Sequence, residues 1–118
     1  MNIILVTGGR NYANRAQLHQ YLYQVHNETP IDILVHGNAR GADTMADDWA
    51  EAKGIQRAIC PAAWDRFDAA IAGHRRNRFM LELGPTLVVA FPGGAGTNNM
   101  VTQAQHKGVR LLDLRALK

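Results

Sequence analysis

The sequence predicts an α/β fold, in which five strands form a mostly parallel sheet with helices on both of its faces. Two observations lead to this prediction. Strand-like apolar runs alternate with helix-like segments along the whole chain, and the links between them are short. The first run, residues 2–7, is apolar and β-branched without a polar alternation, which is typical of a strand buried on both faces of a parallel sheet.

The first half of the chain predicts two strands and the helix between them. Residues 2–7 end at two glycines, which close the first strand. Residues 15–26 carry apolar side chains at helical spacing, so we expect a helix there. A proline separates this helix from a second apolar run, residues 31–36, which is the second predicted strand.

The middle of the chain continues the alternation. Residues 42–53 predict a helix with one apolar side, on which Trp49 is expected to join the core, and Gly54 follows as its end. Residues 55–60 predict the third strand, which a proline closes. Residues 62–68 show neither the helical nor the strand spacing of apolar residues, and they are expected to be irregular.

The last part predicts two more helices and two more strands. A basic helix is expected over residues 71–83, and residues 86–91 are the most strand-like run of the chain. A helix over residues 97–107 and a strand over residues 109–114 complete the pattern. This repeat predicts a Rossmann-like sheet in the strand order 3-2-1-4-5, with ligands expected beyond the carboxyl ends of the first and fourth strands.

Length and composition indicate one globular domain over residues 1–118. The chain is 47% hydrophobic and 19% charged, which excludes a disordered protein. Its net charge of +3 is compatible with an anionic ligand and does not require nucleic acid. Because Cys60 is the single cysteine, no intramolecular disulfide can form, and we expect a cytoplasmic protein. The apolar run at residues 3–6 is too short for a membrane span, so no membrane contact is expected.

Glycine gathers in three loops, which hold seven of the eleven glycines. Each loop follows a predicted strand and precedes a helix, and the predicted strand order brings all three to one edge. Glycine lets a ligand approach the backbone, and a helix N-terminus offers free N–H groups and a positive dipole to a phosphate. We therefore expect a phosphate or nucleotide site there, the alternative being ordinary turn glycines. Its expected residues are Gly8, Gly9, Arg10, Gly37, Asn38, Ala39, Arg40, Gly41, Pro92, Gly93, Gly94, Ala95, Gly96 and Thr97.

Polar side chains outside the glycines complete the candidate ligand site. Arg76, on the basic helix, could join the loop arginines, since a guanidinium grips a phosphate with two parallel hydrogen bonds. Asn77 could contact a base or a hydroxyl, or cap the backbone. Asp43 could hold a pair of ribose hydroxyls, or only complement the dipole of the helix that it begins. Histidine and cysteine lack the spacing of a zinc site, so we expect neither a metal nor a cofactor.

Four segments carry a family resemblance: residues 6–10 (VTGGR), 36–50 (HGNARGADTMADDWA), 73–77 (GHRRN) and 91–97 (FPGGAGT). In this order and spacing they resemble the YspA-like branch of the SLOG superfamily, across nearly the whole chain. The resemblance implies a Rossmann-like protein that senses or processes nucleotide derivatives. Within that superfamily, PGGAGT looks like the phosphate loop of the LOG-type phosphoribohydrolases. GNARGAD is similar to a loop of the DNA-processing proteins that bind single-stranded DNA.

One position departs from the LOG-type motif. That motif reads PGGxGTxxE, and its glutamate takes part in breaking an N-glycosidic bond, whereas this chain has Met100 there. A thioether can neither transfer a proton nor stabilise an oxocarbenium-like centre. If the chain is a hydrolase, Asp43 or Asp65 would have to supply the catalytic carboxylate. Arg76 could match one arginine of the LOG-type catalytic pair.

The main expectation is binding, for sensing or for processing, of a phosphorylated ribosyl ligand, such as a nucleoside monophosphate or an ADP-ribose derivative. One alternative is a phosphoribohydrolase-like enzyme that cleaves nucleotide N-glycosidic bonds. Another is binding of single-stranded nucleic acid, which GNARGAD and the basic residues 75–78 suggest. The small net charge and the 7% aromatic content weigh against this third class, because stacking on aromatic rings supplies much of such affinity.

The basic helix also predicts self-association. Beside its arginines this helix carries four apolar residues, Phe79, Met80, Leu81 and Leu83. They are more than a single apolar stripe that faces the core would contain, so some are expected at the surface. SLOG relatives commonly associate through helices, so the family resemblance also implies self-association. We expect a homo-oligomer, most simply a two-fold dimer. The alternative is a monomer in which Phe79 and Leu83 both turn inward.

Overall fold

The computed structural model describes residues 1–62 and 69–117, and they form one five-stranded sheet with four helices. The strands are β1 (Ile3–Thr7), β2 (Ile33–His36), β3 (Gln56–Ile59), β4 (Leu87–Ala90) and β5 (Leu111–Asp113). The helices are α1 (Arg15–Glu28), α2 (Ala42–Ala52), α3 (Ala69–Glu82) and α4 (Ala95–Lys107). The strands lie in the order β3-β2-β1-β4-β5, and every pairing between neighbours is parallel. The predicted fold class and strand order are confirmed.

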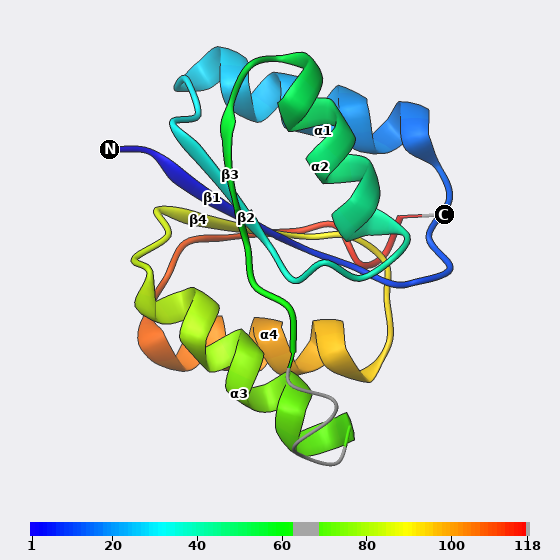
Figure 1. The fold of residues 1–118 in the computed structure, drawn as a ribbon, viewed down its shortest axis with the longest axis vertical. Coiled ribbons are helices and arrows are strands. Elements are labelled where there is room, and N and C mark those ends of the chain that lie inside the picture. The colour runs from blue at the N-terminus through cyan, green and yellow to red at the C-terminus, as the bar shows by residue number, and fades with distance from the viewer. Residues whose placement is uncertain (63–68, 118) are drawn as a thin grey trace.

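Two pairs of helices cover the two faces of the sheet. In Figure 1 the sheet runs across the middle, with α1 and α2 on one side and α3 and α4 on the other. The first strand supplies the core on both sides. Ile4 and Val6 pack in the cluster that holds Trp49, whereas Leu5 between them packs in the cluster that holds Met80. Burial on both faces is why the strands read as apolar runs instead of alternating patterns.

The N-terminus of α4 lies earlier than the sequence predicts. The helix begins at Ala95 instead of residue 97, and Gly94 is its N-cap. Glycine is a poor helix former, so Gly96 resembles a loop residue in the sequence. In the fold, Gly96 belongs to the first helical turn. The free N–H groups of that turn therefore lie directly after Gly93 and Gly94.

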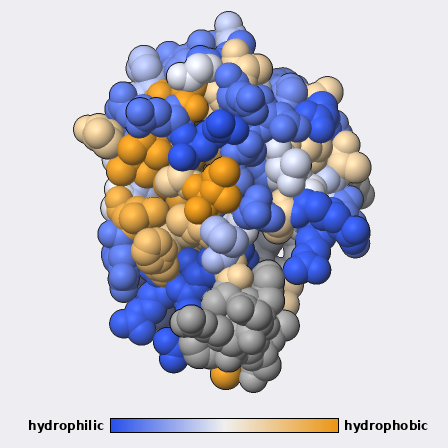
Figure 2. Space-filling model, viewed as in Figure 1, coloured by the Kyte–Doolittle hydropathy of each residue, from blue (hydrophilic) through white to orange (hydrophobic). Residues whose placement is uncertain are grey.

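The apolar residues of α3 divide between the core and the surface. Met80 and Leu81 are buried, whereas Phe79 is 51% and Leu83 is 38% exposed. The arrangement in which Phe79 and Leu83 both turn inward is therefore wrong. Ile59, on the edge strand β3, is exposed as well, and Figure 2 shows apolar side chains gathered on this face of the molecule. Among the described residues, no helix has both the length and the apolar character that crossing a membrane requires.

Candidate functional site

The three glycine loops meet at the carboxyl ends of β1, β2 and β4. The N–H of Gly9, after β1, donates a hydrogen bond of 2.8 Å to the carbonyl oxygen of Pro92, after β4. The carbonyl oxygen of Gly9 accepts a bond of 3.3 Å from the N–H of Ala42, where α2 begins. Direct backbone bonds therefore hold the loops together at the edge that the sequence predicts.

Two of the glycines are required by close contact between backbones. A Cβ at Gly9 would lie 2.9 Å from the Cα of Gly93 and 3.0 Å from the carbonyl oxygen of Pro92. Gly41 has a φ of +85°, and a Cβ there would contact the carbonyl oxygen of Gly9 and lie 2.7 Å from that of Arg10. Because the crowding atoms belong to backbone, they cannot move aside as a flexible side chain could. Glycine therefore sets how closely the loops approach.

A cleft of about 1230 Å³ opens where the loops meet. It exceeds the roughly 300–1,000 Å³ of typical small-molecule sites. The expected site residues that line it are Gly8, Gly9, Arg10, Ala39, Asp43, Arg76, Asn77, Pro92, Gly93, Gly94, Ala95, Gly96 and Thr97. Gly37, Asn38 and Arg40 line an adjoining cavity of about 420 Å³ instead, and it shares Arg10, Ala39 and Arg76 with the cleft. Gly41 lines neither, since it packs against the loop after β1.

The cleft also has walls that the sequence does not indicate. Residues 11–14, between β1 and α1, line it, and so do Gly73 and His74 of α3. In the first of these walls the ring of Tyr12 packs against Phe91, with the ring centroids 5.5 Å apart. The position of Tyr12 shortly after two loop glycines is the one signal that could have predicted this contact.

Arg76 reaches from α3 to the loop after β2. Its Nη1 donates to the carbonyl oxygen of Gly37 at 2.8 Å, and its Nε donates to Asn77 Oδ1 at 3.0 Å. Burial lowers the pKa of Arg76, because a cation loses hydration there. Among the described residues it forms no ion pair. Arg76 is a partly buried guanidinium with two modest acceptors, and its neighbour Asp43 is not within ion-pair distance, so an anion beside it would be favourable.

The side chain of Asn77 makes hydrogen bonds within the fold, and Asn77 also lines the cleft. Its side chain is buried, and Nδ2 donates to the carbonyl oxygen of Gly96 at 3.1 Å and to Asn99 Oδ1 at 3.0 Å. Both acceptors lie in the first turns of α4. Asn77 therefore links Arg76 to the N-terminus of α4, and it fixes the guanidinium relative to the loop of Gly93 and Gly94.

Asp43 is only 5% exposed and lines the cleft. Its Oδ2 accepts hydrogen bonds from the N–H groups of Gly37 at 3.0 Å and Ala39 at 3.3 Å. Its Oδ1 is buried and has no hydrogen-bond partner among the described residues. Burial raises the pKa of Asp43 because the carboxylate loses its hydration, while the two backbone bonds and the nearby His36 and Arg76 oppose that rise.

His36 orients the loop that supplies these backbone groups. Its Nδ1 accepts a hydrogen bond of 3.0 Å from the N–H of Asn38, so Nδ1 carries no proton. Its Nε2 must then carry the proton, and it donates to Asp47 Oδ1 at 2.8 Å. Both ring nitrogens are therefore occupied in holding the loop, in which Asn38 has a left-handed φ of 60°.

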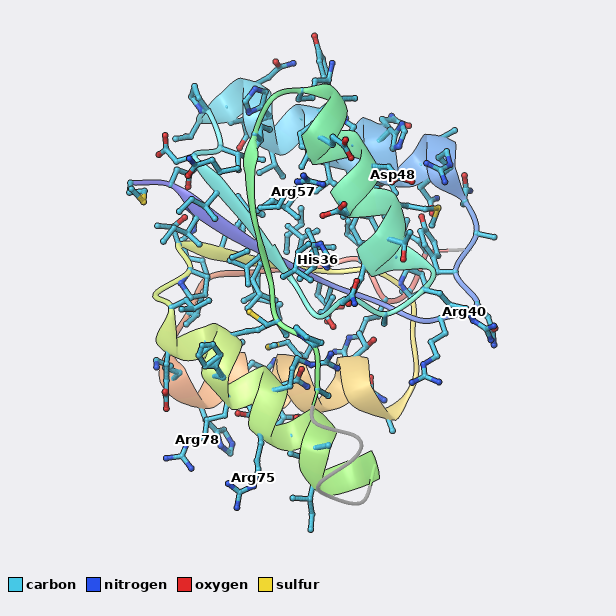
Figure 3. All side chains as sticks on the ribbon, in the orientation of Figure 1. His36, Arg40, Asp48, Arg57, Arg75 and Arg78 are labelled. Atoms are coloured by element: carbon cyan, nitrogen blue, oxygen red, sulfur yellow. The ribbon has the colours of Figure 1, made fainter. Side chains whose placement is uncertain are left out.

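The other arginines lie outside the cleft or at its margin. Figure 3 shows Arg75 and Arg78 projecting from α3 away from the sheet, and Arg78 Nε lies 3.5 Å from Glu82 Oε1. Arg10 and Arg40 are exposed and border the adjoining cavity. Of the three arginines on this helix, the fold therefore brings Arg76 to the floor of the cleft and leaves the other two at the outer surface.

Of the candidate catalytic carboxylates, Asp43 lines the cleft. Met100, at the position of the LOG-type glutamate, is fully buried in the cluster of Leu5 and Met80 and does not line the cleft. Asp65 lies outside the described residues. Within residues 1–62 and 69–117, no three His, Cys, Asp or Glu side chains come together as a metal would require.

Comparisons with known proteins agree with this architecture. The model of the YspA, cpYpsA-related SLOG family matches residues 2–67. The Gene 61 protein of Mycobacterium phage D29 is 31% identical over 121 residues, which cover 96% of each protein. DNA processing protein A (DprA) from Streptococcus pneumoniae has a similar structure, with a TM-score of 0.78 at 16% identity over 96% of this chain. This chain spans 50% of that DprA chain, and at such low identity the likeness concerns the fold.

Proposed function

This chain belongs to the YspA, cpYpsA-related SLOG family, and on that premise we propose that it binds a phosphorylated ribosyl ligand in the cleft. A nucleoside monophosphate or an ADP-ribose derivative has the required chemistry. The observation that carries the proposal is Arg76, a partly buried guanidinium without an ion pair in the described structure, held beside the N-terminus of α4.

The start of α4 supports a phosphate at this place. Its N-cap, Gly94, provides no side-chain hydrogen bond, and no acidic residue lies in the first turn. By contrast, α1 begins at Asn14, whose side chain accepts a bond from the N–H of Gln17. The first N–H groups of α4 therefore lack the usual side-chain cap, and a phosphate would satisfy them while it pairs with Arg76.

Thermal-shift measurements test the proposal directly. The four nucleoside monophosphates and ADP-ribose are compared with the corresponding unphosphorylated nucleosides. A ligand that binds the folded chain raises its Tm at saturation, and only the phosphorylated compounds are expected to do so. If every phosphorylated compound leaves the Tm of the folded protein unchanged, the proposed function is wrong.

Replacing Arg76 by methionine should weaken binding of the phosphorylated ligand by about 10- to 150-fold, as expected for loss of hydrogen bonds to a charged group. Isothermal titration calorimetry measures the change. Arg78→Met is the matched control, because it removes the same charge from the outer side of the same helix. Equal affinities for Arg76→Met and the unchanged protein would remove Arg76 from the site.

We also propose that the protein forms a two-fold dimer through the face of β3 and α3. Phe79 and Ile59, 51% and 47% exposed, lie on this face and line a common small cavity. β3 is an edge strand, paired with β2 alone, so its outer backbone groups are available to a partner. Apolar surface beside an unpaired strand edge favours association with a second copy of the chain.

Light scattering at tens of micromolar protein should give a mass near twice 13.0 kDa. Phe79→Glu places a charge in the proposed interface and should return the mass to that of one chain. Tyr23→Glu is the control, since Tyr23 is 49% exposed on α1, on the opposite side of the sheet. A mass of 13.0 kDa for the unchanged protein would refute the dimer.

A further inference from the structure

Asp43 has one carboxylate oxygen that the fold uses and one that it does not. Oδ2 accepts the N–H groups of Gly37 and Ala39, and these two bonds fix the orientation of the carboxyl group. Oδ1 is buried without a partner among the described residues. Buried polar atoms in folded proteins are nearly always hydrogen-bonded, so this oxygen calls for a partner beyond the residues that the structure describes.

Holding the loop before α2 explains only the first oxygen. The N–H groups of Gly37 and Ala39 need one acceptor atom, and the amide oxygen of an asparagine would supply it as well as the carboxylate of aspartate does. The second oxygen adds a buried charge that these two bonds do not need. Burial raises the pKa of Asp43, because the carboxylate loses hydration that the surrounding groups do not fully replace. The unpaired oxygen therefore accepts no hydrogen bond from the described residues.

The cleft offers the place for a partner, since Asp43 and Arg76 both line it. Arg76 can only donate hydrogen bonds, and an ionised Asp43 can only accept them. Together they complement a ligand that carries an anionic group and a hydroxyl group, which a phosphorylated ribose does.

We propose that Asp43 determines the sugar specificity of the cleft, by accepting a hydrogen bond at Oδ1 from a ribose hydroxyl of the ligand. This inference rests on the proposed function, and it adds the requirement that the ligand carry a ribose hydroxyl, which phosphate binding alone does not need. A ligand with the same phosphate and base but without that hydroxyl leaves Oδ1 unpaired, as it is in the free protein. The cleft therefore distinguishes a ribonucleotide from the deoxy form that lacks this hydroxyl.

The Asp43→Asn variant distinguishes the roles of the two carboxylate oxygens. The N–H groups of Gly37 and Ala39 need an acceptor, so the asparagine must turn its Oδ1 towards them. Its Nδ2 then occupies the place of the unpaired oxygen and presents a donor where the ligand hydroxyl needs an acceptor. Asp48→Asn, on the exposed side of the same helix, is the matched control.

The experiment measures the Kd of AMP, GMP, CMP and UMP and of their 2′-deoxy and 3′-deoxy forms by calorimetry. For the unchanged protein, one of the two deoxy forms should bind about tenfold or more weakly than the ribonucleotide, as expected for a hydrogen bond to a charged group. Asp43→Asn should weaken ribonucleotide binding by a similar factor and abolish the difference between the two forms. Asp48→Asn should keep the difference.

Several outcomes would overturn the inference and leave the proposed function in place. One is that the unchanged protein binds the ribonucleotides and both deoxy forms equally, a test that needs no variant to fold. Another is that Asp43→Asn weakens all forms by the same factor, which would indicate an effect on the loop and not on the hydroxyl. If none of the monophosphates binds, the inference fails, and the ADP-ribose arm of the thermal-shift measurement decides the proposed function separately.

Discussion

Replacement of Gly41 by alanine should destabilise the protein by about 2–5 kcal/mol, the sum of a backbone and a packing contribution. The φ of +85° costs a residue with a Cβ roughly 1–2 kcal/mol. The added methyl group would also press on the carbonyl oxygens of Gly9 and Arg10, and such overpacking costs typically 1–3 kcal/mol. Urea or thermal unfolding of the two proteins measures the difference in the free energy of unfolding.

Gly54→Ala supplies the control for the backbone contribution. Gly54 has a similar φ of +70°, but a Cβ there meets no atom within 4 Å. It should therefore lose only about 1–2 kcal/mol. The excess loss in Gly41→Ala then reports the crowding between the start of α2 and the loop after β1, together with the ψ of −126° at Gly41, which lies outside the left-handed helical region. If both variants lose the same stability, the close approach of these loops does not constrain the fold.

Met100→Glu should be the most damaging change in α4, with a loss of about 3–5 kcal/mol, the cost of leaving an uncompensated charge in a core. Met100 is fully buried, and its cluster of Leu5, Val35 and Met80 contains no group that could pair with a carboxylate. The substitution restores the glutamate of the LOG-type motif in sequence, yet it would place that glutamate in the core and not in the cleft. Thermal unfolding measures the loss.

Thr102→Glu and Met100→Leu are the controls for this prediction. Thr102 is exposed on the same helix, so a glutamate there should change stability by no more than about 0.5 kcal/mol. Leucine conserves the volume and the apolar character of Met100 and should cost less than about 1.5 kcal/mol. A Met100→Glu protein that unfolds at the same temperature as Thr102→Glu would show that α4 can rotate this position out of the core.

The fold was largely predictable because burial on both faces leaves an unusually clear pattern. The three central strands β1, β2 and β4 are largely apolar runs, and the short links leave few ways to connect parallel strands. The start of α4 was not predictable in the same way. Glycine disfavours helices, and only the tertiary bond from Asn77 to the carbonyl oxygen of Gly96 shows how that turn is held.

The place of the candidate site followed from the sequence, but the roles of its side chains did not. Glycines after strands indicated the loops, since the strand order brings these loops together. Charge alone does not show which of Arg75, Arg76 and Arg78 faces the cleft, because that depends on the rotation of α3 about its axis. The family resemblance singled out Arg76, and this residue does line the cleft. The two oxygens of Asp43 also differ only through the positions of Gly37 and Ala39, which a sequence does not specify.

The geometry of α3 connects events on its two sides. Arg76 faces the cleft and Phe79 lies one turn further along the same helix at the outer surface, where residues three apart are neighbours. If Arg76 binds the proposed ligand and Phe79 lies in the proposed dimer interface, a ligand that fixes Arg76 would also restrain the turn that carries Phe79. If the two equilibria are coupled in this way, thermodynamic reciprocity requires that dimerisation change the ligand affinity by the same factor by which the ligand changes the dimer affinity. The nucleotide concentration would then control the fraction of chains that are in the dimer. The protein concentration would in turn change the nucleotide concentration at which the cleft is half occupied.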